Sequence, residues 1–369
     1  MLYRPEDFEP LTDEPWDEAR VRASIGAIVA DVDAAYGGDA LWPADEWDGW
    51  HAALPLKNLY AGAAGVVWAL DALRRRGHAQ TRHDLADIAQ RALEAWRAAP
   101  DFIRGYELPS RAEASLFCGE SGILYVALRL TGRADLADAL LARVRENAGT
   151  EAVEVMWGVA GTMLVARATD WRDAWEESAA ALRAARGPDG MWTNRLFGAD
   201  RRSLSPPHGL VGNMVALGGG DDLATEVLAR EAIVEDGFAN WPSSDGELRL
   251  QWCNGAPGIV IHASDYLDQE LLRMGANLVW QAGPPGMEKG PCICHGTAGN
   301  GHAFLTMFAR TGDELWLDRA RRFAMHALGQ VERRGRGRYS LFTGDLGVAL
   351  YAADCLDERA GYPVLDGWD

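Results

Sequence analysis

The tetrapeptide Gly296-Thr297-Ala298-Gly299 decides the fold, because its Gly-x-x-Gly pattern recurs along the whole chain. The seven copies have a mean spacing of 47 residues and begin at Gly62, Gly119, Gly158, Gly209, Gly255, Gly296 and Gly344. One Gly-x-x-Gly carries little information because glycine is common, but a regular period of this length is typical of repeats built from pairs of helices. The sequence therefore predicts seven copies of one helical unit.

Each copy is followed by an apolar stretch and preceded by an amphipathic one. The seven amphipathic stretches cover residues 17–36, 81–99, 134–148, 172–186, 221–235, 264–282 and 313–334. In the second of them, Leu85, Ile88, Ala92 and Trp96 share one helix face. A helix that is apolar all round lies inside a protein, and an amphipathic helix lies outside. We therefore predict an all-α fold, a seven-fold α/α toroid with an outer and an inner ring of helices.

An open superhelix of helix pairs is the alternative architecture. The toroid is favoured because the inner stretches are so apolar that an open array would expose them to water. Glycine at the start of each inner helix lets neighbouring backbones approach closely where the ring is crowded. We expect residues 1–369 to form a single domain, with residues 1–16 as an N-terminal extension.

Composition excludes several classes of partner. The chain has 369 residues and a net charge of −18, which argues against nucleic acid or an anionic membrane as the main partner. No apolar stretch reaches the ~20 residues that span a bilayer, and the N-terminus lacks the apolar core of a signal peptide. Five cysteines are too few, and odd in number, for a disulfide scaffold. We expect a cytoplasmic protein without a membrane span.

The repeat register brings together residues with metal-binding side chains. Cys253 and Cys294 each lie two residues before the first glycine of consecutive repeats, and His208 and His295 share the next position. Since consecutive repeats are neighbours, we expect Cys253 to meet Cys294 and His295 at the mouth, the end of the toroid where the inner helices begin. Two thiolates and an imidazole suit Zn²⁺ and leave its fourth position open, as in catalytic zinc sites.

The other cysteines have weaker claims. Cys292 is a rival ligand, whereas Cys118 and Cys355 are interpreted as core residues. A redox pair of Cys292 with Cys294 is less favoured, because the spacing is not the usual C-x-x-C.

The two cysteine motifs resemble a known family. Q-W-C-N-G-A-P-G at residues 251–258 and C-H-G-T-A-G-N-G at residues 294–301 resemble the zinc motifs of the lanthionine synthetase C-like (LanC-like) family. The end of the chain, S-L-F-T-G-D-L-G-V-A-L-Y-A-A-D-C-L, is similar to the last repeat of that family. The resemblance runs from about Asp17 to the C-terminus. It implies the same toroid, a Zn²⁺ cofactor and addition of a thiol to dehydroalanine or dehydrobutyrine, with a thioether as the product.

The resemblance also implies roles for individual residues. His208, in P-P-H-G-L-V-G, matches the active-site histidine of the family, and Glu154 matches an active-site acid. Arg249 matches the family's arginine, and Lys289 matches a lysine associated with glutathione. Asn254 departs from the pattern, because cyclases often have Tyr and stand-alone members often His after the first zinc cysteine, so the resemblance implies no proton donor at this position. For Glu154 and Arg249, a structural ion pair between them is the alternative interpretation.

These residues fit a C–S bond-forming reaction. Zn²⁺ deprotonates the thiol, the thiolate attacks the β-carbon, Arg249 stabilises the developing enolate, and His208 protonates the α-carbon. The implied partners are a dehydrated peptide or protein and a thiol donor, either glutathione or a cysteine of the same peptide, the latter giving lanthionine rings. Glutathione is favoured because Lys289 and Arg249 concentrate positive charge beside the zinc residues. The alternatives are a non-catalytic zinc- and glutathione-binding scaffold, and a sugar-processing α/α barrel, which normally relies on paired carboxylates.

Overall fold

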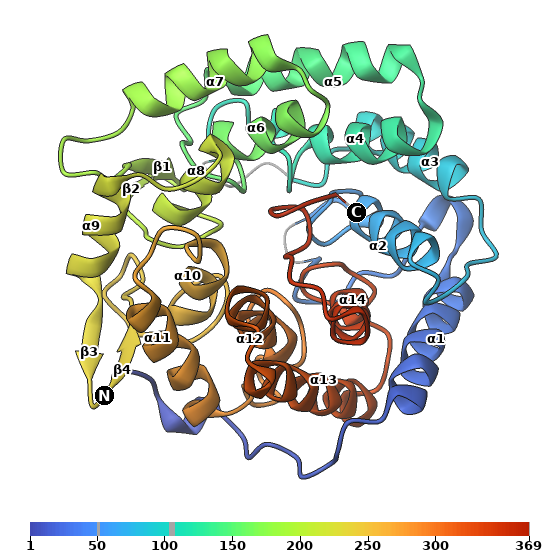
Figure 1. Cartoon of the computed structure of the whole chain (residues 1–369). Helices are drawn as coiled ribbons and strands as arrows, with labels where there is room; N and C mark the ends of the chain where they lie inside the picture. The colour runs from blue at the N-terminus through green and yellow to red at the C-terminus, as the bar shows by residue number, and fades with distance from the viewer. Residues whose placement is uncertain (50–51, 103–107, 369) are drawn as a thin grey trace.

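Two concentric rings of helices make up the computed structural model, which describes residues 1–49, 52–102 and 108–368 (Figure 1). The outer ring contains α1 (Glu18–Ala35), α3 (Leu85–Ala98), α5 (Ala134–Asn147), α7 (Arg172–Ala184), α9 (Asp222–Glu231), α11 (Gln269–Ala282) and α13 (Glu314–Arg334). The inner ring contains α2 (Ala63–Arg75), α4 (Glu120–Thr131), α6 (Val159–Ala168), α8 (Leu210–Leu217), α10 (Ala256–His262), α12 (Thr297–Thr311) and α14 (Asp345–Asp357). The predicted seven-fold α/α toroid is confirmed.

Inner and outer helices begin in different ways. Every inner helix starts directly after the first glycine of its Gly-x-x-Gly motif, and that glycine is its N-cap. Five outer helices, α1, α3, α9, α11 and α13, instead have an aspartate N-cap whose carboxylate accepts backbone N–H bonds. Such caps satisfy the unpaired N–H groups of the first turn. A glycine N-cap therefore distinguishes the inner helices, whereas the outer helices α5 and α7 begin after Arg133 and Trp171 without a side-chain cap.

The second glycine of each motif lies where neighbouring repeats meet. A Cβ at Gly122 would lie 2.3 Å from the carbonyl oxygen of Leu116 and 2.7 Å from the Leu59 side chain of the preceding repeat. A Cβ at Gly258 would lie 2.1 Å from the Trp252 carbonyl oxygen and 2.8 Å from the Pro206 ring. Only glycine fits at such distances, so the predicted reason for the repeated motif is confirmed.

Backbone hydrogen bonds join the repeats around the mouth. The N–H of Tyr60 donates to Phe117 O (3.0 Å), and the N–H of Phe342 donates to Tyr60 O (3.2 Å). The chain of bonds continues from Cys294 N to Phe342 O (2.9 Å) and from Cys253 N to Cys294 O (3.2 Å). Because Phe342 of the last repeat bonds to Tyr60 of the first, the ring is closed. The open superhelix is thereby excluded.

Three of the predicted outer helices have bounds that differ by four residues or more, and the stretch predicted over residues 81–99 becomes helical only at Leu85. The stretch predicted as a helix over residues 264–282 becomes helical only at Gln269, and the stretch over residues 221–235 leaves the helix after Glu231. The latter continues into β3 (Ile233–Glu235), which pairs antiparallel with β4 (Phe238–Asn240), and a second hairpin joins β1 (Asn194–Leu196) to β2 (Ala199–Arg201). These short hairpins lie between outer and inner helices and leave the helical fold class unchanged.

Residues 1–16 lie against the outer ring between β4 and α13 (Figure 1). Leu2 is buried, and its carbonyl oxygen accepts a hydrogen bond from Asn240 Nδ2 (2.8 Å). The Glu9 carboxylate bonds to His326 Nε2 (2.6 Å), on α13. This segment is therefore held at Leu2 and at Glu9. Across the described part of the chain, we find no helix with the length and apolar character needed to cross a membrane.

Candidate functional site

Cys253 and Cys294 lie together at the mouth of the toroid. Their side chains are hydrogen-bonded to each other, which lowers the pKa of Cys253 to about 6 and raises the pKa of Cys294 well above its usual value. The two sulfurs thus share one proton. The backbone bond from Cys253 N to Cys294 O fixes the two loops in this arrangement. The structure therefore brings together the two cysteines that the repeat register predicts as neighbours.

His295 follows Cys294 in the sequence, but its side chain is hydrogen-bonded to a different cysteine, outside the pair of Cys253 and Cys294. Its imidazole is hydrogen-bonded to Cys292, and the negative charge of that sulfur raises the pKa of His295 to about 9. Within residues 1–49, 52–102 and 108–368, no three His, Cys, Asp or Glu side chains form a group that could hold a metal ion. The donor set nevertheless fits Zn²⁺ in its chemistry, since two adjacent sulfurs lie next to a residue that offers an imidazole. Cys292 stays an alternative ligand.

Each of the two cysteine sulfurs accepts a hydrogen bond from a further side chain. The Tyr60 hydroxyl donates to Cys294 Sγ (2.9 Å), and Gln251 Nε2 donates to Cys253 Sγ (3.1 Å). Burial and the neighbouring cysteines raise the pKa of Tyr60 well above its usual value, so its hydroxyl stays protonated and acts as the donor. Sequence reasoning missed both donors, although Tyr60 has the same repeat position as the cysteines.

Glu154 and His208 form a pair on the adjoining repeats. His208 Nδ1 lies 2.8 Å from Glu154 Oε2, and the Glu154 carboxylate also accepts the N–H groups of Met156 (3.1 Å) and Trp157 (2.5 Å). Burial lowers the pKa of His208, but the hydrogen bond and charge of Glu154 outweigh it, and the pKa is raised. Because Nδ1 is engaged and the His208 side chain is 38% exposed, Nε2 is the ring nitrogen left for a substrate.

Arg249 pairs with a near neighbour in the sequence. Its guanidinium bonds to both carboxylate oxygens of Asp245 (2.8 and 2.7 Å) and lowers the pKa of Asp245 to about 2. Glu154 is bonded to His208 instead, so the alternative of an ion pair between Glu154 and Arg249 is wrong. The charge of His208 also helps to lower the pKa of Cys253, after the larger effect of Cys294.

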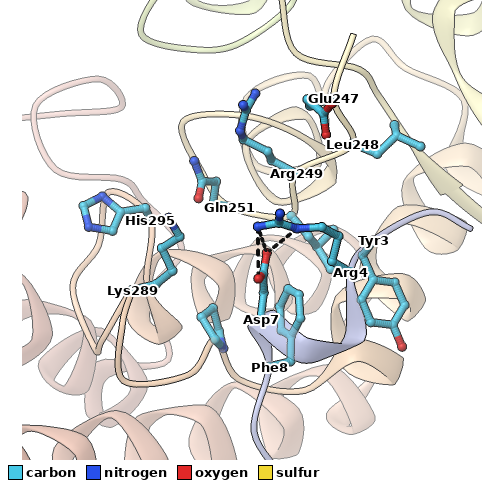
Figure 2. Close-up of a pocket in the computed structure, with 12 residues that line it drawn as sticks. Tyr3, Arg4, Asp7, Phe8, Glu247, Leu248, Arg249, Gln251, Lys289 and His295 are labelled. Atoms are coloured by element: carbon cyan, nitrogen blue, oxygen red, sulfur yellow. Dashed lines mark hydrogen bonds and ion pairs between the residues drawn. The ribbon is translucent and has the colours of Figure 1, made fainter. Parts of the chain in front are cut away.

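A pocket of about 400 Å³ adjoins the cysteine pair and is lined by Arg249, Lys289, His295, Gln251 and the N-terminal segment. Figure 2 shows Lys289 and His295 together on one side and Arg4, paired with Asp7 (2.8 Å), on another. Lys289 has no ion-pair partner among the residues that the structure describes. Sequence reasoning missed Arg4, because residues 1–16 lie outside the repeats and carry no motif.

Comparisons with known proteins agree with this picture. Residues 220–363 match the model of the family described as lanthionine synthetase C-like protein. Over 133 residues, the chain is 32% identical to Glutathione S-transferase LANCL1 of Danio rerio, covering 32% of each protein. Over 123 residues, it is 32% identical to LanC-like protein GCL1 of Arabidopsis thaliana, covering 28% of each. The aligned part thus spans about a third of the length of these curated relatives.

Among solved structures, the toroid is similar to that of nisin cyclase, with a TM-score of 0.61, 14% sequence identity and coverage of 93% of this chain and 96% of the other. At this identity the likeness concerns the fold. The class of protein is thus an α/α toroid with cysteine motifs at its mouth, and residues 220–363 of the chain are similar to the LanC-like family. The family match includes Cys253, Cys294 and His295 but begins only after Glu154 and His208, so the pairing of these two rests on the geometry alone.

Proposed function

We propose that the protein is an enzyme that adds a thiol to dehydroalanine or dehydrobutyrine residues of a peptide or protein, with Zn²⁺ as cofactor and glutathione as the thiol donor. The observation that carries the proposal is the pair of adjacent sulfurs, Cys253 and Cys294, next to a cationic pocket. The buried carboxylate of Glu154, which holds His208 beside the same cysteines, supports it.

Cys253, Cys294 and His295 would hold the metal. When bound, Zn²⁺ lowers the pKa of an added thiol, so that its sulfur is nucleophilic at neutral pH. The low pKa of Cys253 fits this role, because a cysteine ligand must lose its proton to bind.

The pocket would bind and orient the thiol donor. Glutathione carries two carboxylates and one ammonium group, and a pocket of about 400 Å³ falls in the size range of small-ligand sites. Lys289 offers an unpaired cation, while Arg249 and Arg4 offer guanidinium groups that already bind carboxylates. Because His295 lines the same pocket, a ligand held there lies next to the cysteine pair. A cyclase needs no such anion site, since its thiol arrives attached to the peptide.

His208 and Arg249 would act on the dehydrated residue. As the thiol sulfur bonds to the β-carbon, the π electrons move to the carbonyl oxygen and form an enolate, which a nearby cation such as Arg249 stabilises. The enolate then takes a proton at the α-carbon, for which protonated His208 is the donor. The hydrogen bond from Nδ1 to Glu154 keeps His208 charged and directs Nε2 to the substrate. The proton lost by the thiol balances the proton gained by the α-carbon.

Both sources of thiol occur among the names of similar proteins, one a glutathione S-transferase and the other a cyclase. The cationic pocket favours glutathione for this chain. All five cysteines are free, which agrees with a reducing compartment, and we propose that the protein acts in the cytoplasm.

Mass spectrometry of a dehydroalanine peptide incubated with the protein and glutathione tests this function. We expect enzyme-dependent addition of one glutathione per dehydroalanine, above the uncatalysed rate. A second peptide, with both a cysteine and a dehydroalanine, serves as the control for cyclisation. Ring closure without any glutathione adduct would replace this proposal with a cyclase. Glutathione binding without any product would replace it with a binding protein.

A further inference from the structure

Two side chains outside the proposed ligand set donate hydrogen bonds to the two proposed zinc cysteines. Tyr60 bonds to Cys294 Sγ at 2.9 Å, and Gln251 bonds to Cys253 Sγ at 3.1 Å. The donors come from different repeats, the first and the fifth, and each serves one sulfur. Each proposed zinc sulfur therefore has a donor of its own.

Tyr60 is held firmly in place. Its backbone N–H and C=O both belong to the ring of hydrogen bonds at the mouth, through Phe117 and Phe342. Its ring stacks on that of Phe342, with centroids 5.1 Å apart and planes 17° from parallel. Because both backbone and ring are fixed, the hydroxyl has little freedom to leave Cys294.

Gln251 is also fixed. Its N–H donates to Asn254 O and its C=O accepts the N–H of Asn254, both at 3.0 Å, so the loop around Cys253 forms a closed turn. The residue lines the pocket with Lys289 and His295 (Figure 2). Its amide therefore lies between the pocket and Cys253.

Such donors matter because the proposed reaction places an electrophile beside three sulfurs. The β-carbon of dehydroalanine can be attacked by the added thiol, but also by either cysteine of the protein. A hydrogen bond to a thiolate withdraws electron density and makes that sulfur less nucleophilic. Donors to metal ligands also fix ligand orientation and tune the metal.

We propose that Tyr60 and Gln251 are positioning residues that lower the nucleophilicity of Cys294 and Cys253, so that the added thiol is the sulfur that reacts. The inference rests on the proposed function, because it assumes that both cysteines are zinc ligands. It assigns each donor to one cysteine, and this assignment makes it testable without the enzymatic reaction.

The experiment measures how fast iodoacetamide alkylates each cysteine of the zinc-loaded protein, with peptide mapping by mass spectrometry. Tyr60→Phe removes the hydroxyl but keeps the ring that stacks on Phe342, and Gln251→Met removes the amide at similar size. Tyr351→Phe is the matched control, because it deletes a buried hydroxyl that donates to the Ala320 carbonyl (2.7 Å) on α13. The absorption of the cobalt-substituted variants gives a second readout of thiolate electron density.

We expect Tyr60→Phe to speed alkylation of Cys294 about tenfold and to leave the rate at Cys253 unchanged. Gln251→Met should speed alkylation of Cys253 by a similar factor and leave the rate at Cys294 unchanged. The thiolate-to-cobalt absorption should shift to longer wavelength in both variants and not in Tyr351→Phe. Unchanged alkylation and absorption in zinc-loaded variants would overturn this inference and leave the proposed function intact. Equal acceleration at both cysteines in all three variants would also overturn it. A wild-type protein that binds no zinc would overturn the proposed function as well.

Discussion

At the scale of single residues, the pair of Glu154 and His208 has the best-defined geometry. The Glu154 carboxylate is fully buried and accepts two backbone N–H groups besides His208 Nδ1. The hydrogen bond to Glu154 and the negative charge of its carboxylate raise the pKa of His208. The pair therefore favours the charged form of His208 beside the cysteines.

Replacing His208 with Asn should slow the proposed reaction without loss of the metal. The substitution removes a proton donor that lies outside the proposed ligand set, and a positioned acid is worth roughly 10²–10⁴ in rate. Adduct formation and zinc content of His208→Asn, measured on one preparation, check this. If the variant is as fast as wild type, another residue donates the proton, and Glu154 is the next candidate.

Replacing Glu154 with Gln should change the pH dependence of the same rate. The pKa of His208 is raised in the folded protein, so its acid form persists as the pH rises and is lost only above the raised pKa. Without the carboxylate the pKa of His208 falls, and the alkaline limb of the rate profile should move to lower pH. An alkaline limb at the same pH in wild type and Glu154→Gln would show that His208 does not set it.

Lys289→Ala should weaken glutathione binding, and more so at low salt than at high salt. Lys289 lines the pocket without an ion-pair partner in the part of the chain that the structure describes, and salt screens the attraction between exposed charges. The control is Arg172→Ala, which removes an exposed charge from α7 on the outer ring. Calorimetric titration at several salt concentrations measures both. Equal affinities in wild type and Lys289→Ala would remove this residue from the site.

The sequence predicts which residues lie at the site better than it predicts which of them bond to each other. Glu154 and His208 come from separate motifs, and nothing in the spacing predicts that they bond to each other. Arg249 bonds to Asp245, which is only four residues away in the same loop, so the pair can form without contacts between distant segments. Arg4 lies outside the repeats, so no pattern in the sequence points to it. The repeat register places Tyr60 at the mouth but does not predict that its hydroxyl bonds to Cys294.

At the scale of elements, helix periodicity and glycine spacing predict most of the fold. Long amphipathic stretches give helices whose bounds are close to those predicted, because each carries many apolar residues on one face. The hairpins were missed, since their strands of three residues are too short to show alternation. The sequence Asp236-Gly237 is nevertheless typical of a two-residue hairpin turn, and its φ angles of 52° and 80° fit such a turn.

Gly122→Ala tests the packing role of the second motif glycine, away from the cysteines. The added Cβ would lie 2.3 Å from Leu116 O, so the free energy of unfolding should fall by about 1–3 kcal/mol. Gly26→Ala is the control, because Gly26 lies on α1 with nothing within 4 Å of the added Cβ. The control should gain about 0.5–1 kcal/mol from helix propensity. Chemical denaturation measures both, and equal stabilities would refute the close-approach explanation.

At the scale of the whole molecule, the closed ring brings residues with equivalent repeat positions together in one site. Residues two before the first glycine, such as Tyr60, Phe342, Cys294 and Cys253, meet at the mouth because each repeat places them equivalently. Sequence register can therefore predict which residues gather there. It cannot predict how their side chains turn, as the bond from His295 to Cys292 shows.

We propose that thiol addition requires a zinc ion held by Cys253, Cys294 and His295. The most direct measurement is a titration of metal-free protein with Zn²⁺, in which glutathione addition to a dehydroalanine peptide is followed by mass spectrometry. We expect a rate that rises in proportion to zinc, levels off at about one zinc per chain, and stays at background in Cys294→Ala. A full rate in metal-free protein, or a rate in Cys294→Ala that rises as in wild type, would contradict it.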